Sequence, residues 1–122
     1  MRSRLLASMS ALGLTLGGLL VSASPAGAEP AHCSWWNNSI RDLYTAGGIY
    51  FKDGTPIRTG AFSDCNIVGS GSSNHGIDIH CRVKNDQGAN WIHLRDTTTG
   101  VAGWSRADSL SGPATSVPNC FS

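Results

Sequence analysis

The chain has 122 residues, with 9 Lys and Arg against 8 Asp and Glu. Its first 28 residues resemble an export signal, and without Arg2 and Arg4 the remainder carries 7 basic and 8 acidic side chains. That length allows one small domain. Nucleic acids and anionic lipids are bound by clustered Lys and Arg, so a net charge near −1 with scattered cations argues against both as partners.

The N-terminal segment has the three parts of a secretory signal. Arg2 and Arg4 precede an uncharged apolar run over residues 5–21, and Ala26-Gly27-Ala28 fits the small-x-small cleavage pattern. The alternative is a retained membrane anchor, but Ser and Gly dilute the run and no stop-transfer charges follow it. We therefore predict a signal peptide over 1–28 and a product that is secreted, extracellular or cell-wall associated, with no membrane contact after cleavage.

Four cysteines lie in the exported part: Cys33, Cys65, Cys81 and Cys120. An even count in a short secreted chain predicts two disulfides, for which three pairings exist. We favour Cys65 with Cys81 and Cys33 with Cys120, the second bond tying the two ends together. In the chain-entropy model these bonds contribute about 3 and about 4.5 kcal/mol.

A zinc site is the competing interpretation of the cysteines. The pairs His32-Cys33 and His80-Cys81 are sequence neighbours, which point to opposite faces of a strand and chelate poorly. We therefore expect neither a metal nor a cofactor.

Residues 29–46 form a lead-in, in which the spacing of Ile40, Leu43 and Tyr44 predicts a helical turn over 39–44. Short β runs follow at 49–52 and 56–58. The Asp53-Gly54 pair between them is typical of a hairpin.

The next stretch, 69–74, is rich in Gly and Ser and predicts a flexible loop. The clearest strand is 75–84, where Ile77, Ile79, Cys81 and Val83 alternate with polar residues and so share one buried face. Further strands are predicted at 91–95 and 101–105, separated by turns. These elements indicate a small antiparallel barrel or sandwich over 47–111, with a tail over 112–122 held by Cys120.

No catalytic motif is present. The chain has no Gly-x-Ser-x-Gly elbow, no His-Glu-x-x-His and no phosphate-binding Gly-x-x-x-x-Gly-Lys. Isolated His and Asp residues on strands are mostly solvated surface, so we do not expect an enzyme.

The aromatic residues are the strongest candidates for recognition. Trp91 and Trp104 fill the core on one interpretation. On the other, at least one of them lines a shallow groove with Tyr50 and His93, because flat rings supply contact area at low entropic cost. Arg58 is a further candidate, for an acidic group on the ligand.

An ordered set of short motifs resembles the bacterial SH3-like domains of secreted actinobacterial proteins. They are Pro56-Ile57-Arg58-Thr59-Gly60 followed by Cys65 and Val68-Gly69, then Ile77-Asp78-Ile79-His80-Cys81, Trp91-Ile92-His93-Leu94-Arg95 and Thr99-Gly100-Val101-Ala102-Gly103-Trp104. The resemblance covers about two thirds of the exported chain. Ala61 departs from the family's Pro, and Ser105 from its Val.

The resemblance implies a small SH3-like antiparallel β-barrel, the pairing of Cys65 with Cys81, and a non-catalytic role, often the targeting of peptidoglycan peptides. We therefore expect a secreted, monomeric binding module, stabilised by two disulfides, whose partner is peptidoglycan or another cell-surface polymer. The alternative is a protein-binding effector, such as a hydrolase inhibitor, whose partner is an extracellular protein.

Overall fold

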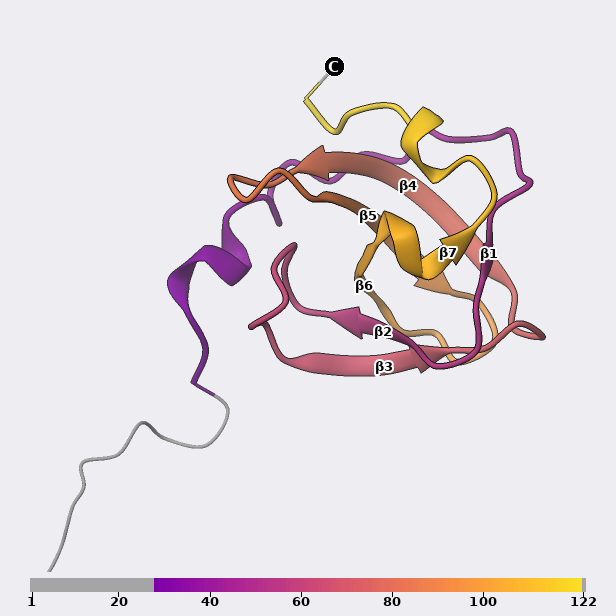
Figure 1. The fold of residues 1–122 in the computed structure, drawn as a ribbon, viewed down its shortest axis with the longest axis horizontal. Coiled ribbons are helices and arrows are strands. Elements are labelled where there is room, and N and C mark those ends of the chain that lie inside the picture. The colour runs from indigo at the N-terminus through magenta and orange to yellow at the C-terminus, as the bar shows by residue number, and fades with distance from the viewer. Residues whose placement is uncertain (1–27, 122) are drawn as a thin grey trace, which may run out of the picture.

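The computed structural model describes residues 28–121, so the predicted signal peptide, apart from Ala28, lies outside the described residues. The chain forms short strands and 3-10 turns (Figure 1). In order, these are η2 (Ala31–Ser34), β1 (Tyr50–Phe51), β2 (Thr55–Arg58), β3 (Ile67–Gly71), β4 (Ile77–Lys84), β5 (Asn90–Asp96), β6 (Ala102–Arg106), η3 (Ala107–Ser109), β7 (Leu110–Ser111) and η4 (Ala114–Ser116). The expectation of an all-β, antiparallel domain is confirmed.

The strands form two sheets rather than one closed barrel. Five strands pair in the order β3-β2-β6-β5-β4, and β1 pairs with β7. Within residues 28–121 the outer strands β3 and β4 do not pair with each other, so the larger sheet stays open. It bends through β6, which places β4 and β5 across from β2 and β3 (Figure 1).

Strand β5 shows how the sheet separates two cores. Ile92 and Leu94 are completely buried on one face, in the main cluster with Phe51 and Ile57. Trp91, which points the other way, belongs to a second cluster with Trp104. Both faces of β5 are therefore covered, which explains why the strand is almost continuously buried.

The turn predicted at Asp53-Gly54 is present, but it does not make a hairpin of its flanking strands. Gly54 has φ +79°, and the N–H of Thr55 donates to the carbonyl of Lys52. Strand β1 then pairs with β7, whereas β2 pairs with β3 and β6. The turn redirects the chain from one sheet to the other, so the hairpin prediction was wrong in its pairing.

The loop predicted at 69–74 is partly a strand. Its first three residues complete β3, which pairs with β2. Gly71 is needed there because a Cβ atom would lie 2.2 Å from the ring of Phe51. The glycine thus marks a close approach between strand and ring rather than flexibility.

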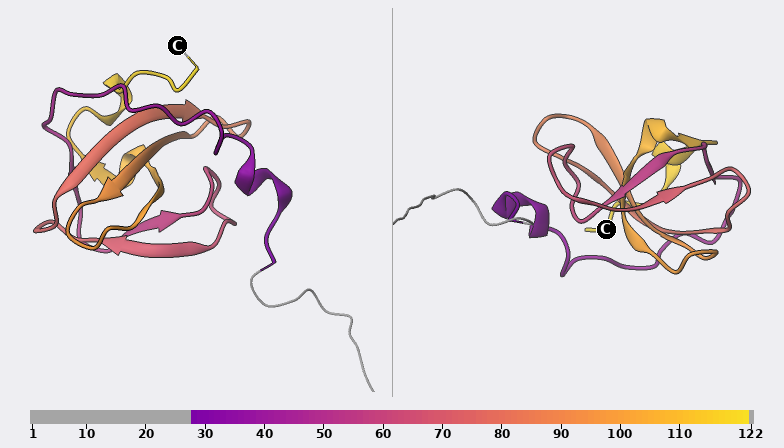
Figure 2. Two further views of the ribbon diagram at one scale, coloured as in Figure 1. Left: turned by 180° about the vertical axis from the view of Figure 1, so that it is seen from behind. Right: turned by 90° about the horizontal axis from the view of Figure 1, so that it is seen from below.

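The lead-in contains no helical turn at 39–44. A 3-10 turn forms earlier, at η2, and residues 40–49 run without regular structure. Ile40 and Leu43 pack against the tryptophan cluster, and Tyr44 packs against the main core. An irregular path lets the segment reach both cores, and Figure 2 shows it passing alongside β4.

Both predicted disulfide pairings were wrong. The bonds join Cys33 to Cys65 and Cys81 to Cys120, with Cα–Cα distances of 5.7 and 4.9 Å. Cys65 lies against the lead-in, whereas the side chain of Cys81 faces the tail. The tail is indeed held by Cys120, as expected, but to β4 rather than to the lead-in.

The two disulfides indicate an oxidising compartment. Over residues 28–121, no helical segment combines the length and the apolar character needed to span a bilayer.

Candidate functional site

The two tryptophans proposed as stacking platforms are interior residues. Trp91 and Trp104 are each 1% exposed, which supports the core interpretation for both, and Trp104 also lines the groove described below. Trp104 donates its Nε1 hydrogen to Oδ1 of Asn37 at 3.1 Å. Trp91 Nε1 is buried without a partner among the described residues.

Three of the predicted site residues fall in one row across the sheet. Arg58 on β2 pairs with Trp104 on β6, which pairs with His93 on β5. The rings of His93 and Trp104 meet edge to face at a centroid distance of 5.0 Å. Tyr50 lies apart, 58% exposed on β1 of the other sheet.

Arg58 has a structural partner. Its guanidinium donates to the carbonyl of Cys65 at 2.9 Å, which links β2 to the segment carrying the first disulfide. This hydrogen bond occupies one of the guanidinium N–H groups that would otherwise be available to a carboxylate on a ligand.

A groove of about 440 Å³ lies where the lead-in crosses the edge of this row. The lead-in contributes one wall. Strands β3, β5 and β6 contribute the rest, together with Thr59 after β2 and Val101 before β6. The lining residues are Asn37, Ile40, Thr59, Val68, His93, Val101, Ala102, Gly103 and Trp104. Apolar walls with a few polar groups are typical of small-ligand and peptide sites.

His93 is the one groove residue with a strongly perturbed imidazole. Burial lowers the pKa of His93 to about 4, and the adjacent His80 acts in the same direction. His93 is therefore uncharged at neutral pH, with one ring nitrogen donating and the other accepting. Because the other lining side chains are also uncharged, the groove carries no formal charge at that pH.

A β-bulge positions the neighbour of His93. The register between β4 and β5 shifts between Ile79 and Cys81, so that Ile79 pairs with Leu94 and Cys81 pairs with His93. The expectation that Ile79 and Cys81 share one face was therefore wrong: Ile79 lies in the main core and Cys81 in the tryptophan cluster. Bulges commonly re-aim a side chain in this way.

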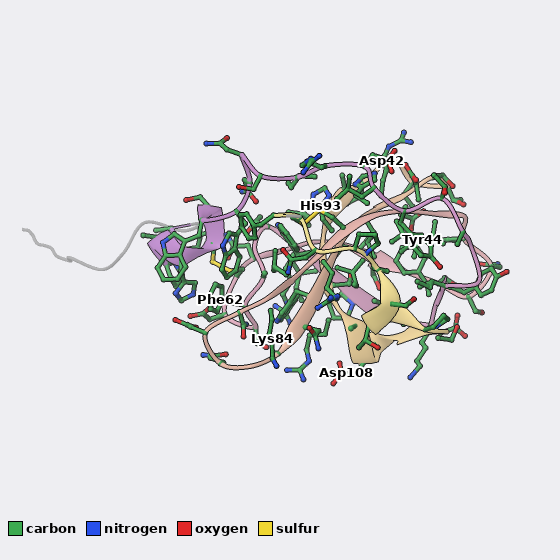
Figure 3. The ribbon with its side chains drawn as sticks, turned by 90° about the horizontal axis from the view of Figure 1, so that it is seen from above. Asp42, Tyr44, Phe62, Lys84, His93 and Asp108 are labelled. Atoms are coloured by element: carbon green, nitrogen blue, oxygen red, sulfur yellow. A yellow bond between two sulfur atoms is a disulfide. The ribbon has the colours of Figure 1, made fainter. Side chains whose placement is uncertain are left out.

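The bulged residue is His80, and its ring faces that of His93. The two rings stack with centroids 5.0 Å apart, and their Nδ1 atoms are 2.8 Å apart. His80 Nε2 lies 3.1 Å from Oδ2 of Asp78, and a carboxylate oxygen of Asp42 lies close by. Figure 3 labels Asp42 and His93, both on the side that the lead-in crosses.

Sequence reasoning identified His93 but missed His80, Asp78 and Asp42. Alternation along β4 places Asp78 and His80 on the same side, which was a usable signal for a pair. Asp42 had no such signal, because it is brought in by the irregular lead-in, whose Leu43 N–H donates to the carbonyl of His80 at 2.9 Å.

A second hollow, of about 500 Å³, lies beside η3. Its strongest charges neutralise each other, since Arg106 donates twice to the carboxylate of Asp108. Another pair, His75 with Asp96 at 2.6 Å, links the turn before β4 to the end of β5. Neither feature combines a cavity with an uncharged buried imidazole, so the groove at His93 is the stronger candidate.

Comparisons with family models, with curated proteins and with solved structures found no match. The interpretation of the groove accordingly depends on its own residues.

Proposed function

We propose that this chain is a secreted, non-catalytic binding module with an SH3-like fold. In this proposal it holds an extended ligand, a peptidoglycan peptide or another cell-surface polymer, in the groove at His93. The observation that carries the proposal is the groove itself, an apolar trough with an uncharged imidazole at its base. Such a site suits a ligand whose contacting groups are uncharged and whose polar atoms meet a few fixed partners.

The groove is built from several separate segments of the chain. Its walls come from segments far apart in the sequence, the lead-in and strands β3, β5 and β6. The Cys33–Cys65 bond ties the lead-in to the segment that precedes β3, and so holds two of these walls together. A preformed groove loses little entropy when the ligand binds.

Strand order is consistent with an SH3-like arrangement, because the first and last strands pair.

The test is sedimentation of the purified, disulfide-intact protein with isolated sacculi. Val68 is 45% exposed and lines the groove, whereas its neighbour Ile67 is 58% exposed on β3 and is not among the lining residues. We expect Val68→Asp to abolish sedimentation, because it places a charge on an apolar wall, and Ile67→Asp to bind like the wild type. Binding should change little with salt, since the groove is uncharged.

Two results would overturn the proposal: a folded protein that does not sediment with sacculi, or equal loss of binding in both variants. The second result would assign binding to the general surface of β3 rather than to the groove.

A second candidate, the protein-binding effector, is favoured by an exposed aromatic group at η2. Trp35 is 56% exposed and packs edge to face against Phe62, beside the Cys33–Cys65 bond. A rigid, exposed Trp is typical of the centre of a protein interface. In this case the wild-type protein inhibits a wall-degrading muramidase. The Trp35→Ala variant no longer inhibits that enzyme but binds sacculi as the wild type does.

A further inference from the structure

Three side chains beside the groove bring potential metal ligands together. One carboxylate oxygen each from Asp42 and Asp78 and one ring nitrogen of His80 all lie within 4.8 Å of one another. Asp78 and His80 come from β4, and Asp42 comes from the lead-in. The set therefore joins two parts of the chain that the sequence separates by more than thirty positions.

The backbone fixes this meeting point. The bulge in β4 turns His80 out of the regular ladder, and its carbonyl accepts the N–H of Leu43. That bond places Asp42, the residue before Leu43, next to the imidazole. Asp42 is exposed, so its side chain is free to adjust.

The spacing suits a small ion. His80 Nε2 and Asp78 Oδ2 are 3.1 Å apart. Two donors bound to one tetrahedral Zn²⁺ at about 2.0–2.1 Å are separated by roughly 3.4 Å. These two atoms already have nearly that separation, and Asp42 closes the third position by a side-chain rotation.

His93 gives His80 the outer partner that metal-bound histidines use. The two Nδ1 atoms, 2.8 Å apart, share one proton. When His80 holds that proton, it donates to His93 Nδ1, and the His80 Nε2 lone pair is directed to the carboxylates. Such a hydrogen bond fixes the tautomer and orientation of a metal-ligating imidazole.

We propose that Asp42, Asp78 and His80 bind one Zn²⁺ ion, with water completing the coordination. One imidazole and two carboxylates favour a borderline ion over Ca²⁺ or Mg²⁺, which take oxygen ligands. The ion clamps the lead-in onto β4. It also fixes the tautomer of His93, whose Nε2 then carries the proton of the neutral ring. This proposal does not depend on what the groove binds.

The chain supplies a matched control. His32 and Asp64 form another pair, 2.7 Å apart, beside Cys33 and Cys65. The two sulfurs there are bonded to each other and cannot act as thiolate ligands. That cluster keeps two ligands, too few for tight zinc binding.

The test is calorimetric titration of the purified, disulfide-intact protein with Zn²⁺ alone, together with ¹⁵N spectra of the imidazoles. We expect one equivalent to bind, with the His80 Nε2 resonance shifted and His93 held as the Nε2–H tautomer. Asp42→Asn should weaken binding by roughly tenfold or more, and His80→Gln should weaken it further. His32→Gln should bind like the wild type.

Asp42→Asn is the decisive variant, because the residue is exposed and its amide keeps the same shape. The proposal is overturned if the wild type binds no stoichiometric Zn²⁺, if Asp42→Asn and His32→Gln lose affinity equally, or if Ca²⁺ binds as tightly as Zn²⁺. Each of these results is independent of the sacculus experiment.

Discussion

Asp96 is a completely buried carboxylate, and its environment keeps it ionised. Burial alone would raise the pKa of Asp96, but the N–H groups of Thr99 and Thr98 and the ring of His75 bind the carboxylate and bring its pKa below the usual value. Oδ1 accepts both amide hydrogens and Oδ2 contacts His75. Asp96 therefore holds the turn between β5 and β6 through buried polar contacts.

We expect Asp96→Ala to lower the free energy of unfolding by about 2–4 kcal/mol, because it removes a buried carboxylate that accepts from the N–H groups of Thr98 and Thr99 and contacts His75. The control is Asp86→Ala, in the exposed turn between β4 and β5. Urea denaturation measures both. A change of the same size in the two variants would show that Asp96 acts only as a turn residue.

His93 makes a distinct contribution to the pH dependence of stability. Its folded pKa, about 4, lies below the value of 6.5 that it has when unfolded. The unfolded chain therefore binds the proton more readily between these values. Stability from the uncharged ring is complete above about pH 6.5 and is lost as the pH falls toward 4, by up to about 3 kcal/mol.

The measurement is the urea midpoint of the wild type and of His93→Gln across pH 4–7. We expect the wild type to be less stable at pH 4.5 than at pH 7, and the variant to show a much flatter dependence. His32→Gln, on the partly exposed lead-in, should keep the wild-type slope. An unchanged slope in His93→Gln would show that His93 does not cause the loss of stability in acid.

At the scale of the elements, β2 and β6 lie so close together at Gly103 that no side chain fits between them. A Cβ atom at Gly103 would lie 2.5 Å from the carbonyl oxygen of Arg58 and 2.8 Å from a methyl group of Ile57. The strands are linked in register at Arg58 and Trp104, next to this contact. Gly103 therefore allows the backbones of β2 and β6 to approach each other closely.

We expect Gly103→Ala to lower the free energy of unfolding by about 2 kcal/mol, because the backbones of β2 and β6 must separate. Ala102→Ser, at the exposed neighbouring position of β6, should have almost no effect. Thermal unfolding compares the two. A Gly103→Ala protein as stable as the wild type would mean that the strands separate at little cost.

Most strands were predictable because their patterns are local. Alternation located β4, and the aliphatic and aromatic run at 91–95 located β5. The bulge at His80 was not predictable, since it depends on the pairing of β4 with β5 and on the lead-in bond to its carbonyl. For the same reason a local pattern singled out His93 as a candidate, whereas no local pattern singled out Asp42.

The roles of Gly71 and Trp104 were not decidable from the sequence. They are set by neighbours that are distant in the chain, the ring of Phe51 and the amide of Asn37. Such contacts leave no periodic trace in the chain. Tertiary packing, and not the local preference of each residue type, therefore determines the roles of these two residues.

At the scale of the whole molecule, two disulfides fix segments that have little regular structure. They close loops of similar size, with sequence separations of 32 and 39. Cys81–Cys120 also aligns the tail beside β4, where the N–H of Arg82 donates to the carbonyl of Pro118 and the N–H of Cys120 donates to that of Arg82. The tail in turn carries Val117, which is completely buried in the main core.

We expect removal of either bond to lower the free energy of unfolding by about 4 kcal/mol from chain entropy. The Cys81→Ala/Cys120→Ala protein should lose more than Cys33→Ala/Cys65→Ala, because Val117 leaves the core with the tail. Urea titration of the two double variants gives the comparison. A greater loss in the Cys33→Ala/Cys65→Ala protein would show that the lead-in, and not the tail, is the principal covering segment.

The order of the crosslinks has a consequence for biogenesis. Cys33 bonds to Cys65, and Cys81 bonds to Cys120, so each bond joins cysteines that are consecutive in the chain. A polypeptide delivered N-terminus first presents its thiols in that same order, and the first partner is present before the second pair has emerged. An oxidase that joined thiols in their order of arrival would therefore produce the native connectivity without the help of an isomerase.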